Sequence, residues 1–281
     1  MTPPPILHAL DALRARTRDW HRAGQSIGLV PTMGALHDGH LSLVEAAQAS
    51  CDRVIVSIFV NPRQFNTPGD LAAYPRSEEE DARKLARLAP DALYVPTTEQ
   101  IYPQGFAITV SVAGLTEVME GVHRPGHFDG VATVCTKLFT QSTATDAFFG
   151  EKDFQQLQVV RRLARDLDLP VTIHGCPTIR DIDGLALSSR NLLLSDRART
   201  IAPRLHDEMQ RIAEGLAAGR PFKELRRAAV DRLDAAGFTR VEYLDLRAAN
   251  DLGALDAATR PARLFAAAWL AGVRLIDNIA I

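Results

Sequence analysis

The sequence has little cysteine, and none of it is paired. Cys51, Cys135 and Cys176 are the three cysteines in 281 residues, and none stands in a C-x-x-C pair. An odd number of cysteines without such spacing argues against a disulfide framework and against a zinc site. We therefore expect a protein of the reducing cytoplasm, with Cys135 as a small core side chain.

The chain also lacks an excess of positive charge and a long apolar run. Lysine and arginine number 32 against 34 acidic residues, so the formal net charge of −2 gives no electrostatic attraction for nucleic acid. The N-terminal MTPPPILHAL lacks the basic start and apolar core of a signal peptide, and the longest apolar run, 264–273, ends at Arg274. These features predict no nucleic-acid partner and no membrane association.

Hydrophobic segments alternate with helical patterns over more than half of the chain. A length of 281 residues with 46% hydrophobic content is enough to bury one substantial core and a smaller second one. Strands are expected at 27–30, 54–59, 92–95, 107–112, 147–149 and 171–174, and helices at 39–49, 77–88, 130–141 and 154–168. This alternation predicts an α/β fold with a Rossmann-like parallel sheet, whose ligands lie at the carboxyl ends of the strands.

The pattern changes after Pro177. Helices are expected at 195–216 and 221–236, followed by short strands at 241–246, 263–268 and 273–276. Helices followed by strands predict a smaller α+β domain. We therefore expect one domain at 1–176 and a second at 177–281.

The decapeptide PTMGALHDGH, residues 31–40, joins a predicted strand to a predicted helix. A helix start attracts anions because its first N–H groups lack partners and the helix dipole is positive there. Gly34 and Gly39 let the backbone turn, and His37 and His40, at i and i+3, could donate to one triphosphate. The histidine spacing alone also suits a metal pair or two solvated side chains. The preceding strand and the glycines favour a nucleotide.

Six further motifs follow this one in order along the chain. The full set is PTMGALHDGHLSLV, SIFVNPRQF, YPRSEEED, HFDGVATVCTKLF, FGEKDFQQL, DGLALSSRN and RLIDNI. Together they resemble the pantoate–β-alanine ligase (pantothenate synthetase) family of the nucleotidyltransferase and class I aminoacyl-tRNA synthetase superfamily. The resemblance runs end to end. It implies that pantoate and ATP form pantoyl adenylate and pyrophosphate, after which the amine of β-alanine displaces AMP.

The resemblance implies catalytic roles for His40, as an acid, and for His37 and Lys152, which would offset the repulsion between two anions. The implied ATP-binding residues are Met33, Gly34, His37, His40, Gly150, Lys152, Asp153, Ile179, Leu187, Ser188, Ser189 and Arg190. DGLALSSRN resembles the mobile lysine-serine loop of the superfamily, with Arg190 in place of the usual lysine. Gly184 would let this loop close as part of a C-terminal lid. Asp153 could equally cap a helix.

The resemblance also implies two acceptor sites. Pantoate would be bound by Gln64, Gln156, Met33 and Phe59, and β-alanine by Gln64 and Arg124. Amides can donate and accept toward the hydroxyls and carboxylate of pantoate, while apolar side chains suit its gem-dimethyl group. Asn61 and Tyr74 are weaker candidates for the same pocket.

Magnesium and a homodimer are implied by the resemblance as well. Asp81 is a candidate Mg²⁺ partner through water, although 78–81 could be only the charged start of a helix. Asp181 and Asp183 have D-x-D spacing, but we expect a plain turn there. Two alternatives stay open: a simple nucleotidyltransferase, which makes an adenylylated product and no amide, and a noncatalytic nucleotide-binding regulator.

Overall fold

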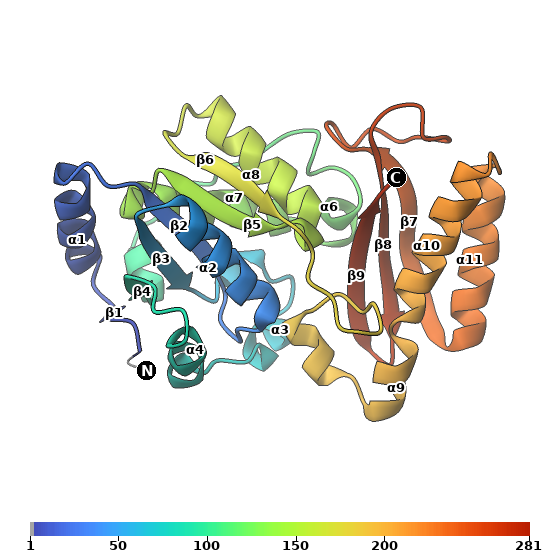
Figure 1. Cartoon of the computed structure of the whole chain (residues 1–281), viewed down its shortest axis with the longest axis horizontal. Coiled ribbons are helices and arrows are strands. Elements are labelled where there is room, and N and C mark those ends of the chain that lie inside the picture. The colour runs from blue at the N-terminus through green and yellow to red at the C-terminus, as the bar shows by residue number, and fades with distance from the viewer. Residues whose placement is uncertain (1–2) are drawn as a thin grey trace. The chain divides into compact units, whose positions relative to one another are not determined.

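The structure is a computed structural model, and it describes residues 3–281. The chain forms two compact units (Figure 1). The first unit extends to Glu151 and continues over Gln155–Pro177, and the second comprises Lys152–Phe154 and Thr178–Ile281. Each unit has its own sheet, and the two are described separately below.

The first unit contains a six-stranded sheet in the order β1-β4-β3-β2-β5-β6. Its strands are β1 (Ile6–Leu7), β2 (Ile27–Thr32), β3 (Arg53–Ile58), β4 (Ala92–Tyr94), β5 (Asp146–Gly150) and β6 (Thr172–Cys176). Every pairing between them is parallel. The predicted α/β fold with a Rossmann-like sheet is therefore confirmed.

Helices connect these strands, as parallel pairing requires. They are α1 (Leu10–Arg22), α2 (Asp38–Ser50), α3 (Pro68–Ala73), α4 (Glu78–Leu85), α5 (Thr98–Ile101), α6 (Glu120–His123), α7 (His127–Ser142) and α8 (Phe154–Asp166), with short 3₁₀ turns η1 (Pro62–Gln64) and η2 (Glu151–Asp153). Neither β1 nor α1 was predicted from the sequence. The two-residue β1 lies at the edge of the sheet, paired only with β4.

Both faces of the parallel sheet are buried, which explains the nearly continuous apolar runs in its strands. On one face, α2 and α4 share a core cluster with β2 to β6 that includes Val44, Leu85 and Phe148. On the other face, the Tyr94 hydroxyl donates to Gln141 Oε1 of α7 at 3.0 Å. Helices on both faces hold the strands so that their carboxyl ends meet along one edge.

The strand order reverses at that edge. From β2 the chain continues to β3 on one side of it, whereas β5 continues to β6 on the other side, and β2 and β5 are neighbours. In open α/β sheets, ligands bind outside the carboxyl ends of strands where the order reverses in this way. The loop after β2 is PTMGALHDGH, and Gly150 ends β5.

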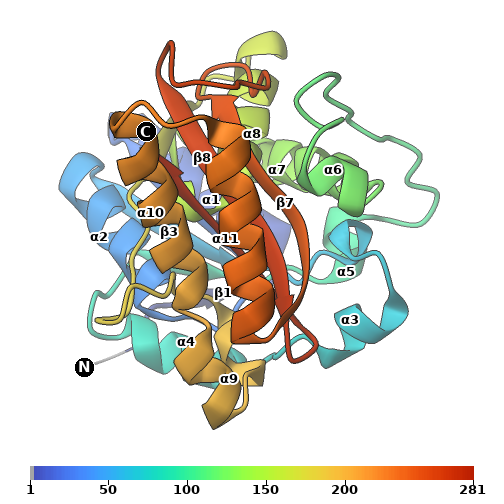
Figure 2. The same ribbon diagram turned by 90° about the vertical axis from the view of Figure 1, so that its right-hand side faces the viewer.

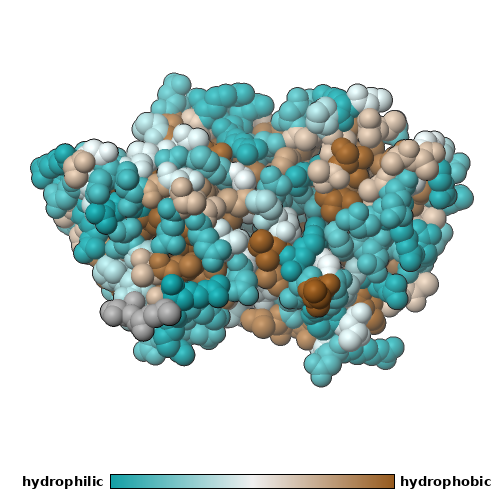
Figure 3. All heavy atoms as spheres, viewed as in Figure 1, coloured by the Kyte–Doolittle hydropathy of each residue, from teal (hydrophilic) through white to brown (hydrophobic). Residues whose placement is uncertain are grey.

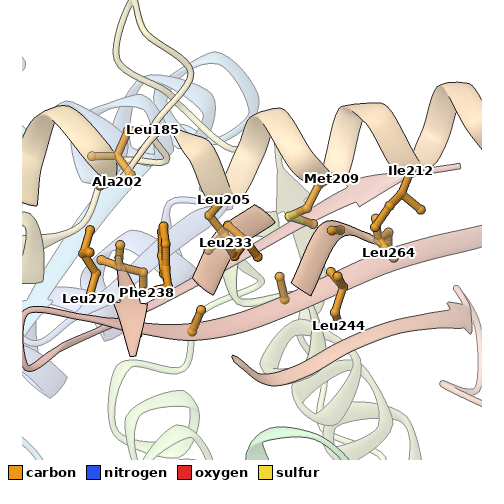
Figure 4. Packing of buried hydrophobic residues seen from close by; sticks show 14 of the residues in the cluster. Leu185, Ala202, Leu205, Met209, Ile212, Leu233, Phe238, Leu244, Leu264 and Leu270 are labelled. Atoms are coloured by element: carbon orange, nitrogen blue, oxygen red, sulfur yellow. The ribbon is translucent and has the colours of Figure 1, made fainter. Parts of the chain in front are cut away.

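The second unit has an antiparallel sheet in the order β7-β8-β9. Its elements are η3 (Ser189–Leu193), α9 (Asp196–Ile201), α10 (Arg204–Ala217), α11 (Phe222–Ala236), β7 (Phe238–Ala248), β8 (Ala262–Leu270) and β9 (Val273–Ala280). Helices α10 and α11 lie side by side across the sheet (Figure 2). Leu205 and Met209 of α10 point toward Leu244 and Leu264 of the strands, in one apolar cluster (Figure 4).

The expected helix at 195–216 is wrong as a single element. It is divided into α9 and α10 around Ala202 and Pro203. Proline has no N–H to donate to the carbonyl four residues earlier, so the helical pattern of apolar residues continues across a break in the hydrogen bonds.

The expected strand at 107–112 is also wrong, because this segment is irregular. Its backbone groups bond to side chains instead of a neighbouring strand. Val110 N–H donates to Thr133 Oγ1 at 3.0 Å, and Arg63 Nη1 donates to the Ile108 carbonyl at 3.0 Å. Alternating residue types gave a strand pattern where no strand edge is available.

The face of the molecule in Figure 3 is mainly hydrophilic, with smaller hydrophobic patches. Among residues 3–281, no helix has the length and apolar character needed to cross a membrane.

Gly130 provides a test of how α7 packs on the loop after β3. A Cβ built on Gly130 would lie 2.5 Å from the Arg63 carbonyl oxygen, so Gly130→Ala would force two backbone segments apart. We expect the free energy of unfolding to fall by about 2 kcal/mol in urea denaturation. Gly69→Ala is the matched helical control, because its Cβ would meet nothing within 4 Å. Equal stability of the two variants would contradict this packing.

Candidate functional site

The loop after β2 turns sharply through two residues with left-handed backbone. Gly34 has φ +83° and Ala35 has φ +50°, and the second value is uncommon for a residue with a Cβ. The Gly34 N–H donates to Thr32 Oγ1 at 3.2 Å, and this hydroxyl donates to the Ser57 carbonyl at 2.9 Å. The turn is thus tied to the ends of both β2 and β3.

Side chains of helix α4 hold the same loop through hydrogen bonds to its main chain. The Asp81 carboxylate accepts from Ala35 N–H at 2.9 Å and from Leu36 N–H at 2.8 Å, and Lys84 Nζ donates to the Leu36 carbonyl at 2.8 Å. Asp81 is 1% exposed. Burial raises the pKa of Asp81 above its ordinary value, although the N–H groups of Leu36 and Ala35 oppose the shift. The sequence predicted Asp81 as a Mg²⁺ partner through water, and the role of Asp81 in holding the loop was missed.

His37 and His40 form the start of α2. His37 is the N-cap residue, and its Nδ1 accepts from Gly39 N–H at 3.2 Å, while His40 Nδ1 accepts from His37 N–H at 3.4 Å. The two ring centroids are 4.1 Å apart. This is a reciprocal capping box built from imidazoles, and the expected neighbouring placement of the two histidines is confirmed.

The capping bonds fix the tautomer of both rings. A nitrogen that accepts from a backbone N–H carries no proton, so each neutral ring carries its proton on Nε2. His37 and His40 therefore each carry the ring proton on Nε2, and both rings lie at a helix start, where the helix dipole favours anions. The arrangement is suited to phosphate oxygens. A metal pair would require unprotonated nitrogens directed at the ion, which these Nε2–H groups are not.

Gln64, from η1, lies against the same loop. Its Nε2 donates to Met33 Sδ at 3.0 Å, and its Oε1 accepts from Asn61 Nδ2 at 3.0 Å. Asn61 Oδ1 in turn accepts from the Tyr102 hydroxyl at 2.7 Å, and burial raises the pKa of Tyr102. Two residues predicted for pantoate, Gln64 and Met33, are thus in contact, with the weaker candidate Asn61 beside them.

The main chain of Gln64 is held by a buried charged cluster. Its carbonyl accepts from His127 Nδ1 at 2.9 Å and from Arg124 Nη2 at 3.1 Å. Arg124 also lies 3.3 Å from His127 Nε2 and 3.5 Å from Glu120 Oε2. Arg124 and Gln64, both predicted for β-alanine, are therefore in direct contact. These bonds give His127 a structural role.

Two adjacent glutamines on α8 behave differently. Gln155 is buried and holds the segment before α6: its Nε2 donates to the Leu115 and Val118 carbonyls at 2.8 Å, and its Oε1 accepts from Glu120 N–H at 3.1 Å. Gln156, the predicted pantoate ligand, is half-buried. Sequence reasoning missed Gln155, because a glutamine buried by loop carbonyls has no local pattern.

Phe59 is the other residue predicted for pantoate. It follows β3 and is 6% exposed, with its N–H donating to the Thr32 carbonyl at 3.0 Å. It contacts the Tyr102 ring with centroids 6.2 Å apart. Phe59 therefore stands at the carboxyl end of β3, as predicted, and Gly150 stands at the carboxyl end of β5.

The second unit contains a pocket of its own. Its lining includes three residues predicted for ATP: Lys152, Ser188 and Arg190. Lys152 has 18% of its side chain exposed and lies 3.9 Å from the Asp153 carboxylate. Arg274 and His206 also line the pocket. Lysine and arginine in one pocket suit an anionic ligand.

A short hairpin, residues 179–187, leads to Ser188. Its two arms join at Arg180 and Ala186, and the Leu187 N–H donates to the Ile179 carbonyl at 3.0 Å. Ile179 and Leu187, both predicted for ATP, therefore pair across the hairpin. Ser188 caps η3, where its Oγ accepts from Arg190 N–H at 3.2 Å, and Ser189 is the first residue of η3.

The two aspartates of the hairpin form ion pairs with one arginine. Arg199 lies 2.8 Å from Asp181 Oδ2 and 2.5 Å from Asp183 Oδ2. The hydrogen bond from Arg199 holds the pKa of Asp183 below its ordinary value. This agrees with the expected turn.

Among the side chains that the structure describes, no group of three or more His, Cys, Asp or Glu is arranged to hold a metal ion. Both carboxylate oxygens of Asp81 accept main-chain N–H groups. The donor set at Asp81 therefore does not fit a direct Mg²⁺ ligand, and contact through water stays a prediction.

A Rossmann-like sheet with histidines at its switch point is typical of enzymes that act on phosphorylated substrates, and the pocket of lysine and arginine in the second unit suits the same class. Residues 5–280 match the family described as pantoate-beta-alanine ligase. The chain belongs to the pantoate–β-alanine ligase family, whose reaction is the ATP-dependent condensation of pantoate with β-alanine.

Curated relatives and solved structures agree. The chain is 68% identical over 275 residues to a pantothenate synthetase of Roseobacter denitrificans, covering 98% of this chain and 97% of the relative. A pantothenate synthetase from Thermus thermophilus superposes with TM-score 0.91 at 43% identity over 98% of both chains. A pantoate-beta-alanine ligase from Francisella tularensis, solved with β,γ-ATP and β-alanine, gives TM-score 0.81 at 33% identity, over 99% of this chain and 97% of that one.

Asp81→Asn tests whether α4 supports the loop. An amide has a single acceptor oxygen, so the variant would leave one of the Ala35 and Leu36 N–H groups facing an NH₂ group. We expect ATP-dependent condensation to fall about 10-fold or more, with the Mg²⁺ concentration for half-maximal activity unchanged. Glu80→Gln, on the exposed neighbour, is the control. A higher Mg²⁺ requirement in Asp81→Asn alone would instead support the predicted contact with magnesium.

Proposed function

We propose that the loop of His37 and His40 binds the triphosphate of ATP while the pantoate carboxylate attacks the α-phosphorus. The observation that carries this proposal is the pair of capping bonds, which places both imidazoles side by side at the start of α2 with the ring proton of each on Nε2. In the first step a carboxylate oxygen forms a bond to the α-phosphorus, and the bond from that phosphorus to the bridging oxygen breaks. Pyrophosphate takes the electron pair.

Donors at the phosphates lower the barrier because the attack brings two anions together. His37 and His40 supply neutral donors from α2. The acid role of His40 stays a prediction, in which its Nε2–H would donate to a phosphate oxygen, as neutral histidines of other enzymes polarise a substrate oxygen. Met33 and Gly34 bring the main chain of the same loop to the nucleotide.

In the second unit, Lys152 would act on the phosphates as a flexible cation and Arg190 as a planar fork. Their common pocket with Ser188 supports this assignment. Gly150, Asp153, Ile179, Leu187 and Ser189 complete the proposed ATP-binding set. Asp153 is exposed, so its carboxylate could bind a ribose hydroxyl as well as contact Lys152.

Gln64 would bind pantoate first and β-alanine afterwards, with Gln156, Met33 and Phe59 around pantoate. Its fixed main chain and its contact with Arg124 support this dual role. In the second step the neutral β-alanine amine attacks the acyl carbon, the bond from that carbon to the AMP oxygen breaks, and AMP leaves with the electron pair. The amine proton passes to solvent.

Three finer assignments belong to the same proposal. We place Mg²⁺ on the triphosphate, where it would neutralise charge, and removal by EDTA with restoration by Mg²⁺ tests this. We propose a homodimer because the resemblance to the family implies one, and light scattering tests this oligomeric state. A cytoplasmic location suits the three free cysteines, and burial raises the pKa of Cys135 to about 12. We also propose that the protein has no nucleic-acid partner. Fractionation and a nucleic-acid binding assay test these two points.

A single assay separates the candidate activities. We expect pantoate-dependent exchange of labelled pyrophosphate into ATP, followed by AMP release and amide formation when β-alanine is added. A simple nucleotidyltransferase would give an adenylylated product and no amide. A regulator would give neither reaction, and absence of both with folded protein would overturn the proposal.

Variants that keep the helix caps isolate the phosphate role of the histidines. His37→Asn retains an N-cap acceptor, and His40→Gln retains the acceptor of a capping box, but both lose the imidazole donor. We expect the exchange rate to fall about 10²-fold in each variant, because the imidazole donor is lost. The melting temperature should change little, because the helix caps are kept. Gln48→Ala, on an exposed part of α2, is the control. Exchange at the wild-type rate in both histidine variants would show that the donors act elsewhere.

A further inference from the structure

Apart from Arg274, which lines the pocket of the second unit, the terminal motif RLIDNI has no role in the reaction described above. It lies on β9, and its Asp277 and Asn278 are 5% and 3% exposed. Adjacent residues of a strand point to opposite faces of the sheet. The two side chains therefore leave β9 in opposite directions, and each reaches one of the segments proposed to bind phosphate.

Asp277 binds the base of the hairpin 179–187. Arg180 donates to both of its carboxylate oxygens, from Nη1 to Oδ2 at 2.6 Å and from Nη2 to Oδ1 at 2.8 Å. His206 Nδ1 lies 3.5 Å from Oδ2, and Asn278 N–H donates to Oδ1 at 2.7 Å. Burial alone would raise the pKa of Asp277, but His206 and Arg180 lower it, so the carboxylate stays charged.

Arg180 also binds the turn of the hairpin, so one guanidinium group joins Asp277 to that turn. Its Nη1 also donates to the Gly184 carbonyl at 3.1 Å. Gly184 has φ +90°, and a Cβ there would lie 2.9 Å from His206 Cδ2. The hairpin is thus held at its turn by Arg180 and placed directly against His206. The chain that leaves it enters Ser188, Ser189 and Arg190.

Asn278 binds the other segment. Its Nδ2 donates to the Lys152 carbonyl at 2.8 Å, and its Oδ1 accepts from Arg263. The Arg263 guanidinium lies over the Phe154 ring, 4.0 Å from its centroid. The Lys152 main chain and the Phe154 ring, on either side of Asp153, are therefore held by residues of the second sheet.

We propose that Asp277 and Asn278 are positioning residues that set the relative placement of Lys152 and the Ser188–Arg190 segment at the phosphates of ATP. This rests on the proposed function of those segments. Asp277 lies in the lining of the pocket that holds Lys152, but its carboxylate is bound by Arg180, so in this assignment it acts on the phosphates through that arginine. Both act through main chain and through Arg180, and their effect is confined to the step that uses the triphosphate.

The effect on the two half-reactions distinguishes positioning from a general structural role. Adenylate formation needs the β- and γ-phosphates, whereas β-alanine attack on preformed pantoyl adenylate does not. A displaced phosphate segment therefore raises the KM for ATP in pyrophosphate exchange and leaves AMP release from supplied pantoyl adenylate unchanged. A loosened unit would slow both reactions.

Asp277→Asn and Asn278→Asp are isosteric tests. The first removes the charge that fixes Arg180, and the second removes the donor to the Lys152 carbonyl while keeping an acceptor for Arg263. We expect each to raise the KM for ATP about 10-fold, since small misplacements at a reacting centre cost one to two orders of magnitude. The KM for pantoate is expected to stay within about twofold of its wild-type value.

Asp251→Asn is the matched control, because Asp251 forms an exposed ion pair with Arg260 in the same unit. If Asp277→Asn does not fold, Arg180→Lys keeps a cation opposite Asp277 but loses the paired geometry, and the same rise in KM is expected. Wild-type KM values for ATP in the folded variants, or parallel loss of both half-reactions, would overturn the positioning role. No exchange by the wild-type chain would instead overturn the proposed function.

Discussion

The buried carboxylate of Asp81 is the contact on which the first half of the candidate site depends. The loop after β2 places Ala35 in a left-handed conformation that costs about 1–2 kcal/mol for a residue with a Cβ. Hydrogen bonds to a charged group contribute about 1.5–3 kcal/mol each, so the two bonds to Asp81 offset this strain. The loop can then deliver His37 to the start of α2 in a fixed geometry.

The second unit uses the same physical device on a different scaffold. There the buried carboxylate of Asp277 holds an arginine, and that arginine holds the Gly184 carbonyl of a tight turn. In both units an acidic side chain away from the reacting atoms fixes the main chain that carries the proposed phosphate-binding residues. The cost of burying charge is met by pairing every oxygen, because an unpaired buried carboxylate would be strongly destabilising.

Much of the fold could be predicted because local pattern and tertiary structure agree. A strand buried on both faces needs a continuous apolar run, and β3 has one. The segment 107–112 has a strand-like pattern, yet no neighbouring strand accepts its hydrogen bonds. Pro203 interrupts a continuous helical pattern through its missing N–H. These errors arise where the partner, and not the local sequence, decides the structure.

For the candidate site, too, the residue types could be predicted from the sequence, but their partners far away along the chain could not. Paired histidines before a helix indicate an anion site, and motif resemblance indicated Lys152 and Gln64 as its companions. The roles of Asp81, Gln155 and Asp277 depend on atoms more than 30 residues away along the chain, so no local pattern reveals them. Each belongs to a motif whose residue types were evident while their partners were not.

The histidine pair shows how structure limits chemistry. His37 and His40 serve as helix caps only while Nδ1 accepts a main-chain N–H, and this requirement assigns the proton of the neutral ring to Nε2. A proton added at Nδ1 would place two donors face to face and break the cap. The same bonds that begin α2 therefore keep the proton of each neutral ring on Nε2, where the proposed function requires a donor to phosphate. Under the proposed function, transition-state charge would be stabilised by hydrogen bonds whose geometry is already set when ATP arrives, so little reorganisation would accompany the reaction.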